Sequence, residues 1–318
     1  MSNILQRKRT EEIDFLKCFL IISVIVLHIV YITNTYPVVH KLILIYTMPT
    51  FTFISGYLVN VNKKGSTFAQ SITKLLILYI ITEGCYIVMA HHLPIKEHID
   101  VLSPKIFLQY LLLHPIGLYW YLHTLIICNC TYYVTNRCIE KCLPFQNGQK
   151  ENIINLIIVL GTLFTIMSVR FNIISAVYAA YYVAGVAIKR SGTNITKIFH
   201  PTWLVLIPIF LSFYFHEQIE CLNMYGIIFN GSIICLLFQI CRHTSTRIKE
   251  HVLFIGKHTL PIYIFSLIFT FSANKFSYLF NFDQTGILLT VITISVAIAG
   301  GIFLYKVTQK IKFIRNLF

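Results

Sequence analysis

The chain has 318 residues, of which 56% are hydrophobic and only 12% are charged, and its mean hydropathy is +0.72. A soluble domain is about half apolar and about a quarter charged, so this chain has more apolar side chains than a water-soluble fold can bury. The composition predicts an integral membrane protein and excludes a disordered chain, a disulfide scaffold and a typical nucleic-acid binder. The net charge of +14 fits basic loops on the cytoplasmic side of a membrane and requires no polyanionic partner.

Helices that cross a bilayer need about 20 mostly apolar residues. We expect an all-α integral membrane protein with about ten such spans: 13–33, 42–61, 70–90, 117–136, 152–169, 172–188, 202–216, 223–241, 255–273 and 285–305. The apolar segment 106–116 is too short to span and favours an interfacial or re-entrant piece. All loops are short, so residues 1–318 are expected to form a single multi-span domain with no soluble domain appended.

The distribution of basic residues predicts the orientation of these spans. With the N-terminus inside, the inner segments carry 20 of the 26 Lys and Arg residues and the outer segments carry five. Because cytoplasmic loops are enriched in Lys and Arg, both termini are expected to be cytoplasmic. The first apolar run is too long for a signal peptide and no small-residue cleavage site follows it. We therefore expect a multi-pass protein of a cell membrane, and the short loops favour a bacterial inner membrane.

The first span places three ionisable residues on one stripe. Asp14 and Lys17 are three residues apart, and His28 lies eleven residues after Lys17, about 16 Å further along a helix and within about 20° of the same face. Ionisable residues in spans are costly and are functional candidates by default. Asp14 and Lys17 also fit an interfacial pair with a snorkelling lysine. His28 fits either a structural histidine bonded to a neighbouring helix or a general base.

The second and third spans add further polar candidates. Ser55 and Gly56 allow a close approach of another helix, by simple packing or beside a cavity. Lys74 opens the third span at the inner surface, where it fits either a phosphate contact or an ordinary inner-side lysine. Glu83 lies inside the third span and must face protein or water, and its partner cannot be named from the sequence.

The fourth span opens with aromatic residues at the outer interface. Trp120 and Tyr121 fit either an aromatic belt or the lining of an acceptor cavity. His123 lies one turn further in and is a candidate to face the same cavity as His28.

The nine cysteines do not indicate a metal site. Most lie inside apolar runs, where cysteine behaves as a small hydrophobic residue. Cys138 and Cys142 share a short basic loop, but the two further ligands that zinc needs are not evident nearby.

Five motifs follow one another along nearly the whole chain. They are Ile13-Asp-Phe-Leu-Lys17 with His28, Met48-Pro-Thr-Phe-Thr-Phe-Ile-Ser-Gly-Tyr-Leu58, Trp120-Tyr-Leu122, Tyr182-Val-Ala-Gly185 with Lys189, and Ile255-Gly-Lys-His-Thr-Leu-Pro-Ile-Tyr263. Together they resemble the motifs of the acyltransferase type 3 family of membrane acyltransferases. The resemblance implies an enzyme of about ten spans that moves an acyl group, usually acetyl from acetyl-CoA, onto a hydroxyl. The usual acceptor is a sugar in a surface glycan or its lipid-linked precursor.

The resemblance also implies roles for single residues. His28 matches the histidine taken as the catalytic base, and Lys17 matches the basic residue, often Arg, eleven positions before it. Lys74 takes the place of a family arginine, so we expect Lys17 with Asp14, and Lys74, at the donor end. Lysine can hold a CoA phosphate as a point charge but lacks the fork of arginine. The expected partners are the acyl-CoA co-substrate, a sugar acceptor and the lipid bilayer, with no bound cofactor and no nucleic acid.

The sequence departs from the family pattern in two ways, and two other functions are weighed against the acyltransferase interpretation. Many members have a histidine soon after the last motif, where this chain has Ile264, Phe265 and Ser266. Many also carry an extracytoplasmic hydrolase-like domain that is not found here, which suggests direct transfer or transfer through a partner. The alternative function is a non-enzymatic polysaccharide exporter or flippase subunit, which has no need of a base aligned with a phosphate-binding end. An ion-coupled transporter would show paired broken helices, which we do not find. A covalent acetyl-histidine step stays open beside direct transfer.

Overall fold

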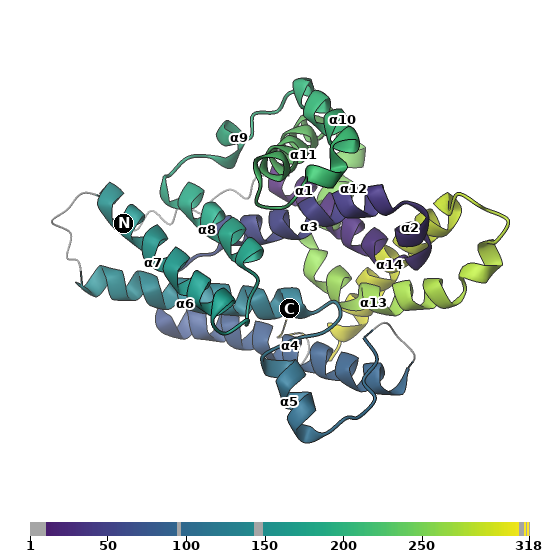
Figure 1. Cartoon of the computed structure of the whole chain (residues 1–318), viewed down its shortest axis with the longest axis horizontal. Helices are drawn as coiled ribbons and strands as arrows, with labels where there is room; N and C mark the ends of the chain where they lie inside the picture. Colours follow the sequence, from purple (N-terminus) through teal and green to yellow (C-terminus); the bar gives the residue numbers. More distant parts are fainter. Residues whose placement is uncertain (1–10, 94–96, 143–148, 312–314, 316, 318) are drawn as a thin grey trace. The chain divides into compact units, whose positions relative to one another are not determined.

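The computed structural model describes residues 11–93, 97–142, 149–311, 315 and 317. Within these ranges the secondary structure is helical and contains no strand, which confirms the all-α prediction (Figure 1). The chain divides into two compact units, and two of the three borders between them fall inside helices, at 51/52 and 306/307. Unit 1 comprises the chain up to Phe51 and Asn194–Lys306, and unit 2 comprises Thr52–Thr193 and the chain from Val307.

Unit 1 is organised around its first helix. Its elements are α1 (Glu11–Leu27), α2 (Val30–Thr35), the first part of α3 (Pro37–Leu58), α9 (Ile195–Ile198), η1 (Trp203–Val205), α10 (Leu206–Tyr214), η2 (His216–Gln218), α11 (Met224–His243), α12 (Thr246–Lys257), α13 (Thr259–Lys275), η3 (Ser277–Phe280) and α14 (Ile287–Thr308). The apolar side chains of α1 are buried around most of its circumference, as expected of a helix inside a bundle. It packs against α11, α12 and α13 (Figure 1).

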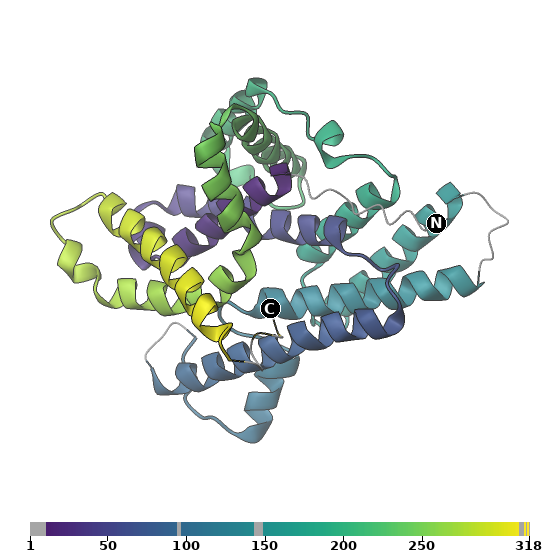
Figure 2. The same ribbon diagram turned by 180° about the vertical axis from the view of Figure 1, so that it is seen from behind.

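Unit 2 is a second group of helices. Its elements are the last part of α3, α4 (Gly65–His92), α5 (Pro104–Leu112), α6 (Trp120–Cys142), α7 (Gln149–Val169) and α8 (Ala176–Arg190). α4 packs against α5 and α6, and α6 packs against α7 and α8 (Figure 2). The core of α6, α7 and α8 is formed by residues such as Tyr132, Leu160 and Tyr182. The apolar segment 106–116 is helical up to residue 112, as part of the short helix α5, and its interfacial or re-entrant placement stays a prediction.

The first predicted span, 13–33, is not one continuous helix. The helix α1 ends at Leu27, Ile29 is extended, and α2 begins at Val30. The β-branched residues that follow favour helix only weakly, so tertiary contacts can interrupt it. The chain then turns again at Tyr36, because the residue before a proline is kept out of the helical region, and Pro37 opens α3.

The ninth predicted span, 255–273, is also divided. The axes of α12 and α13 differ by 80° at a break on His258. A continuous helix would require residue 261 to donate its amide hydrogen to the carbonyl of Lys257, and Pro261 has none. The His258 imidazole bonds instead to the carbonyl of Phe254 at 2.8 Å. The last family-like motif therefore forms a bend, and the helix α13 begins at Thr259.

Each of the ten predicted spans contains a helix, but fewer helices are long and apolar enough to cross a membrane. Among the described residues four meet this requirement, namely α3, α4, α11 and α14, and the bent pair of α12 and α13 makes a fifth if it is one span. The chain is thus a helical protein with membrane-length apolar helices. The ten-span topology stays a prediction, and Arg7, Lys8, Arg9 and Lys312, on which its orientation partly rests, lie outside the described residues.

Candidate functional site

The predicted pair on the first helix is formed. The ammonium of Lys17 lies 3.4 Å from the carboxylate of Asp14, and these side chains are 15% and 3% exposed. The helix α12 crosses α1 closely at this point. A Cβ added to Gly256 would overlap the carbonyl oxygen of Asp14. Lys249 of α12 also pairs with Glu11 of α1, with nitrogen and oxygen 2.5 Å apart. The first and last motifs of the sequence therefore lie side by side in unit 1.

The candidate base His28 stands at the break between α1 and α2. Its amide still bonds to the carbonyl of Ile25, which closes the last turn of α1 tightly. Its side chain is partly buried, and no described residue forms a hydrogen bond with its imidazole. His40 of α3 lies within electrostatic range of the ring. A histidine with unengaged ring nitrogens can take a proton from an incoming hydroxyl without first losing a bond.

One residue that the sequence did not single out holds this break. The carboxamide of Asn274, in the last turn of α13, donates to the carbonyl of His28 at 2.8 Å. Its oxygen accepts the amide hydrogen of Val30 at 3.0 Å. The available signal was a polar side chain in an apolar helix, but the predicted span ended at residue 273, one position short of it.

Polar contacts also occur along the middle of α1. The hydroxyl of Ser23 bonds to the carbonyl of Phe19 at 2.9 Å and to the hydroxyl of Tyr46 on α3. The hydroxyl of Ser23 is therefore already hydrogen-bonded, and His28 is left as the candidate for proton transfer at this end of α1.

In unit 2, the second and fourth motifs cross closely. An added Cβ on Gly56 of α3 would overlap the carbonyl of Tyr182, and one on Gly185 of α8 would overlap the carbonyl of Phe53. Each glycine thus makes room for the backbone of the other helix, as small residues do in membrane helix pairs. This explains why each of the two helices has a glycine at the crossing.

The third motif joins this crossing through side chains. The hydroxyls of Ser55 and Tyr121 are 2.8 Å apart and hydrogen-bonded. The indole of Trp120 contacts the ring of Tyr178 in α8, with ring centroids 4.7 Å apart and the rings tilted by 32°. Three of the predicted candidates, Ser55, Trp120 and Tyr121, are therefore brought together, with Tyr178 added by the fold.

His123 and Glu83 are also buried in unit 2. The Nε2 of His123 donates to the carbonyl of Leu112 at 3.0 Å, which ties α6 to α5, while its Nδ1 is buried without a described partner. The carboxylate of Glu83 is 0% exposed and accepts the amide hydrogen of Ile116 at 2.7 Å. Gly117 follows with a positive φ of 65°, pressed against the ring of Tyr86. Glu83 and Tyr86 thus fix the turn that leads into α6.

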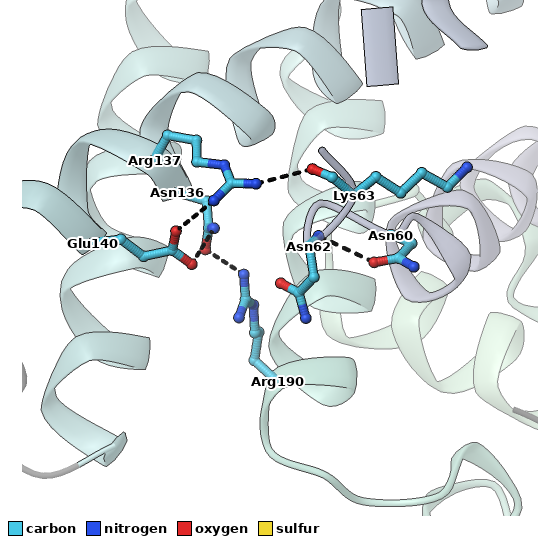
Figure 3. A network of polar contacts seen from close by, with 7 residues as sticks. All are labelled: Asn60, Asn62, Lys63, Asn136, Arg137, Glu140 and Arg190. Atoms are coloured by element: carbon cyan, nitrogen blue, oxygen red, sulfur yellow. Dashed lines mark hydrogen bonds and ion pairs between the residues drawn. The ribbon is translucent and has the colours of Figure 1, made fainter. Parts of the chain in front are cut away.

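A polar network with two guanidinium groups ties the ends of α6 and α8 together (Figure 3). The guanidinium of Arg190 donates to the hydroxyl of Tyr132 at 2.7 Å and to the side-chain oxygen of Asn136. Asn136 in turn donates to Glu140 at 2.8 Å. Arg137 donates to Glu140 at 3.3 Å and to the backbone carbonyl of Lys63 at 2.9 Å. In the sequence, Arg190 and Arg137 count only as inner-side charges, and no local pattern predicts this network.

The remaining predicted candidate, Lys74, is exposed on α4. It belongs to unit 2, whereas Lys17 and His28 belong to unit 1. Joint binding of one donor by Lys17 and Lys74 stays a prediction, and so does the shared cavity of His28 and His123.

The five motifs form two groups of contacts, one in each unit, and the comparison with protein families covers both. A family model described as an acyltransferase domain matches residues 10–306. The chain belongs to this acyltransferase family. The match runs through all five motifs and nearly the whole length of the chain, which confirms the resemblance. Comparisons with curated proteins and with solved structures gave no match.

Proposed function

We propose that this chain transfers an acyl group, most simply acetyl, from acyl-CoA to a hydroxyl of a sugar, with His28 as the general base. The acceptor would be a surface glycan or its lipid-linked precursor. The proposal is supported by membership of the acyltransferase family over residues 10–306. The observation that carries the choice of base is the His28 imidazole, which stands at a helix break with no described hydrogen-bond partner.

In this proposal the acceptor oxygen attacks the thioester carbon as His28 removes the hydroxyl proton. The new carbon–oxygen bond forms an ester, the carbon–sulfur bond breaks, and the proton passes from the imidazolium to the leaving thiolate to give free CoA. The pantetheine arm would cover the distance between a phosphate-binding end at Lys17 and His28, which is about 16 Å if the geometry of α1 extends to His28. Lys74 would add a second cation for the donor phosphates.

The same proposal includes a membrane setting. About ten spans with both termini in the cytoplasm would give a cytoplasmic donor and an external acceptor access to one protein of a bacterial inner membrane. The excess of basic residues in the inner segments supports this orientation. A family match that crosses both units supports one functional domain. A reporter fused to the C-terminus that proved active only outside the cell would contradict the topology.

The transfer is tested with radiolabelled acetyl-CoA. Membranes from cells in which the gene is deleted supply the acceptor, and the purified chain in nanodiscs supplies the activity. We expect base-labile label in the glycan fraction with the wild-type chain. His28→Ala should lower the rate by about 100-fold or more, as loss of a general base does.

The matched control is His98→Ala, because the side chain of His98 is 44% exposed and is remote from the motifs in sequence. It should transfer acetyl at the wild-type rate. Equal transfer by His28→Ala and the wild-type chain would reject His28 as the base. If the wild-type chain transferred no acetyl group, and deletion of the gene made unexported glycan accumulate inside the cell, the result would favour an exporter.

A further inference from the structure

The helix break at His28 leaves backbone groups that need partners. Ile29 is extended between α1 and α2, so the amide of Val30 is the first of a new helix and has no carbonyl acceptor within it. In an apolar surrounding an unpaired backbone group is so unfavourable that only helices and closed barrels span membranes. A break at this place therefore requires a built partner.

Asn274 supplies that partner with both ends of one side chain. Its amide nitrogen lies 2.8 Å from the carbonyl oxygen of His28, and its amide oxygen lies 3.0 Å from the nitrogen of Val30. A carboxamide carries an N–H donor group and a carbonyl acceptor in a single plane, as a peptide group does. It can therefore replace a peptide group at an interrupted helix, which neither an aspartate nor an alanine can do.

The segment after the break is fixed independently. The hydroxyl of Tyr31 donates to the carbonyl of Gln284 at 2.7 Å. Its ring lies against Gly286, where an added Cβ would overlap it. Ile29 is fully buried and packs with Ile32 and others against α14. The backbone on the far side of His28 is thus anchored to the loop before α14, and the near side belongs to α1.

We propose that Asn274 is a positioning residue that holds the backbone of His28 at the helix break and thereby sets the direction of its imidazole. This inference rests on the proposed function, in which His28 is the base. Asn274 touches the main chain of His28 and Val30 and takes no proton itself. Loss of its two bonds lets residues 28–30 adopt other backbone angles, and small misplacements of a catalytic group cost about 100-fold in rate.

The test compares Asn274→Ala and Asn274→Asp with Ser272→Ala in the acetyl-CoA assay. Ser272 lies on the same helix, is exposed, and bonds only within that helix to Ile268. We expect both Asn274 variants to insert normally, to keep the KM for acetyl-CoA within about twofold and to lose about 10- to 100-fold in kcat. Ser272→Ala should match the wild-type chain. Aspartate should not rescue, because it cannot donate to the His28 carbonyl.

Hydrogen exchange supplies a readout that does not depend on activity. Exchange at the Val30 amide should be faster in Asn274→Ala than in the wild-type chain, with unchanged exchange in the middle of α1. An unchanged kcat in both Asn274 variants, or parallel losses of kcat, donor binding and inserted protein, would overturn the positioning role. If His28→Ala is inactive while Asn274→Ala is fully active, this inference alone fails. If His28→Ala is active, the proposed function fails.

Discussion

Two residues of α1 stand in different chemical surroundings. The ammonium of Lys17 already has the carboxylate of Asp14 at 3.4 Å, whereas no described residue hydrogen-bonds the imidazole of His28. A donor phosphate at Lys17 has to compete with or join an existing ion pair. A substrate hydroxyl bound at His28, as proposed, would displace no hydrogen bond from a described residue. The two proposed roles therefore need separate tests.

Removal of the Lys17 charge tests the donor-binding role. We expect Lys17→Met, which keeps the length of the side chain, to raise the KM for acetyl-CoA by about 10- to 100-fold, since a charge-assisted hydrogen bond is worth about 1.5–3 kcal/mol. Lys17→Arg should restore it. The measurement is initial rate against acetyl-CoA concentration in the nanodisc assay.

Lys249→Met is the matched control for this change. Lys249 also pairs with a carboxylate of α1, that of Glu11, in the same unit. Its loss should leave the KM for acetyl-CoA unchanged. An unchanged KM in Lys17→Met, or an equal rise in both variants, would assign Lys17 to an interfacial pair rather than to the donor.

At the level of helices, close packing at the motifs depends on glycine. Gly256 brings α12 onto the backbone of Asp14, and Gly56 and Gly185 bring α3 and α8 together. In each case the atom met by an added Cβ belongs to backbone, which cannot rotate away. These glycines mark helix contacts rather than flexible points.

Gly256→Ala should therefore separate α1 from α12 and lower the thermal unfolding temperature in detergent. Overpacking of this kind costs about 1–3 kcal/mol. Gly161→Ala is the control, because no described atom outside the neighbouring residues and backbone of α7 lies within 4 Å of an added Cβ there. Alanine there should be neutral or stabilising by up to about 1 kcal/mol. Equal unfolding temperatures for Gly256→Ala and the wild-type chain would contradict the close crossing.

The start of α14 should depend on pH through Asp283, which lies in the loop before the helix. Hydrogen bonds from the Thr285 hydroxyl and from the amide of Leu288 hold the pKa of this carboxyl below its ordinary value of 3.8. Because the folded pKa is depressed, the stabilisation is present above the ordinary value and is lost as the pH falls through the folded pKa.

Hydrogen exchange at residues 286–290 should accordingly rise as the pH is lowered through about 4 and below, after correction for the intrinsic rate. Asp283→Ala, which removes both acceptor oxygens, should show fast exchange at both neutral and acid pH. A wild-type chain whose corrected exchange is the same at pH about 6 and about 3 would show that the Asp283 cap contributes nothing.

The positions of the helices could be predicted from the sequence, and so could one of the two interruptions, whereas the other could not. Hydropathy located a helix in every predicted span because apolar runs are a local property. The break at His28 depends on Asn274, which is 246 residues away in the chain. The bend at His258 had a local cause in Pro261, since a proline removes one helical bond, and the prediction of a continuous span overlooked it.

For the whole molecule, the sequence predicted the motifs but not their contacts. The order of the motifs along the chain identified the family, and the match over residues 10–306 confirms it. The pairing of Asp14 with Lys17 followed from helical spacing. The contacts of Gly256 with Asp14 and of Gly56 with Tyr182 join segments far apart in sequence, and no local pattern specifies such pairs. For the same reason the Arg190 network was missed.

The central claim is that this chain esterifies a sugar hydroxyl by means of His28, and the most direct measurement is NMR of surface glycans before and after mild base. Cells would carry the wild-type chain, His28→Ala at equal membrane level, or no copy. The account predicts that ester-linked acetyl is present with the wild-type chain and is lost equally in the other two strains. Acetyl unchanged in His28→Ala, or unchanged acetylation on a reduced amount of total glycan after deletion, would contradict it.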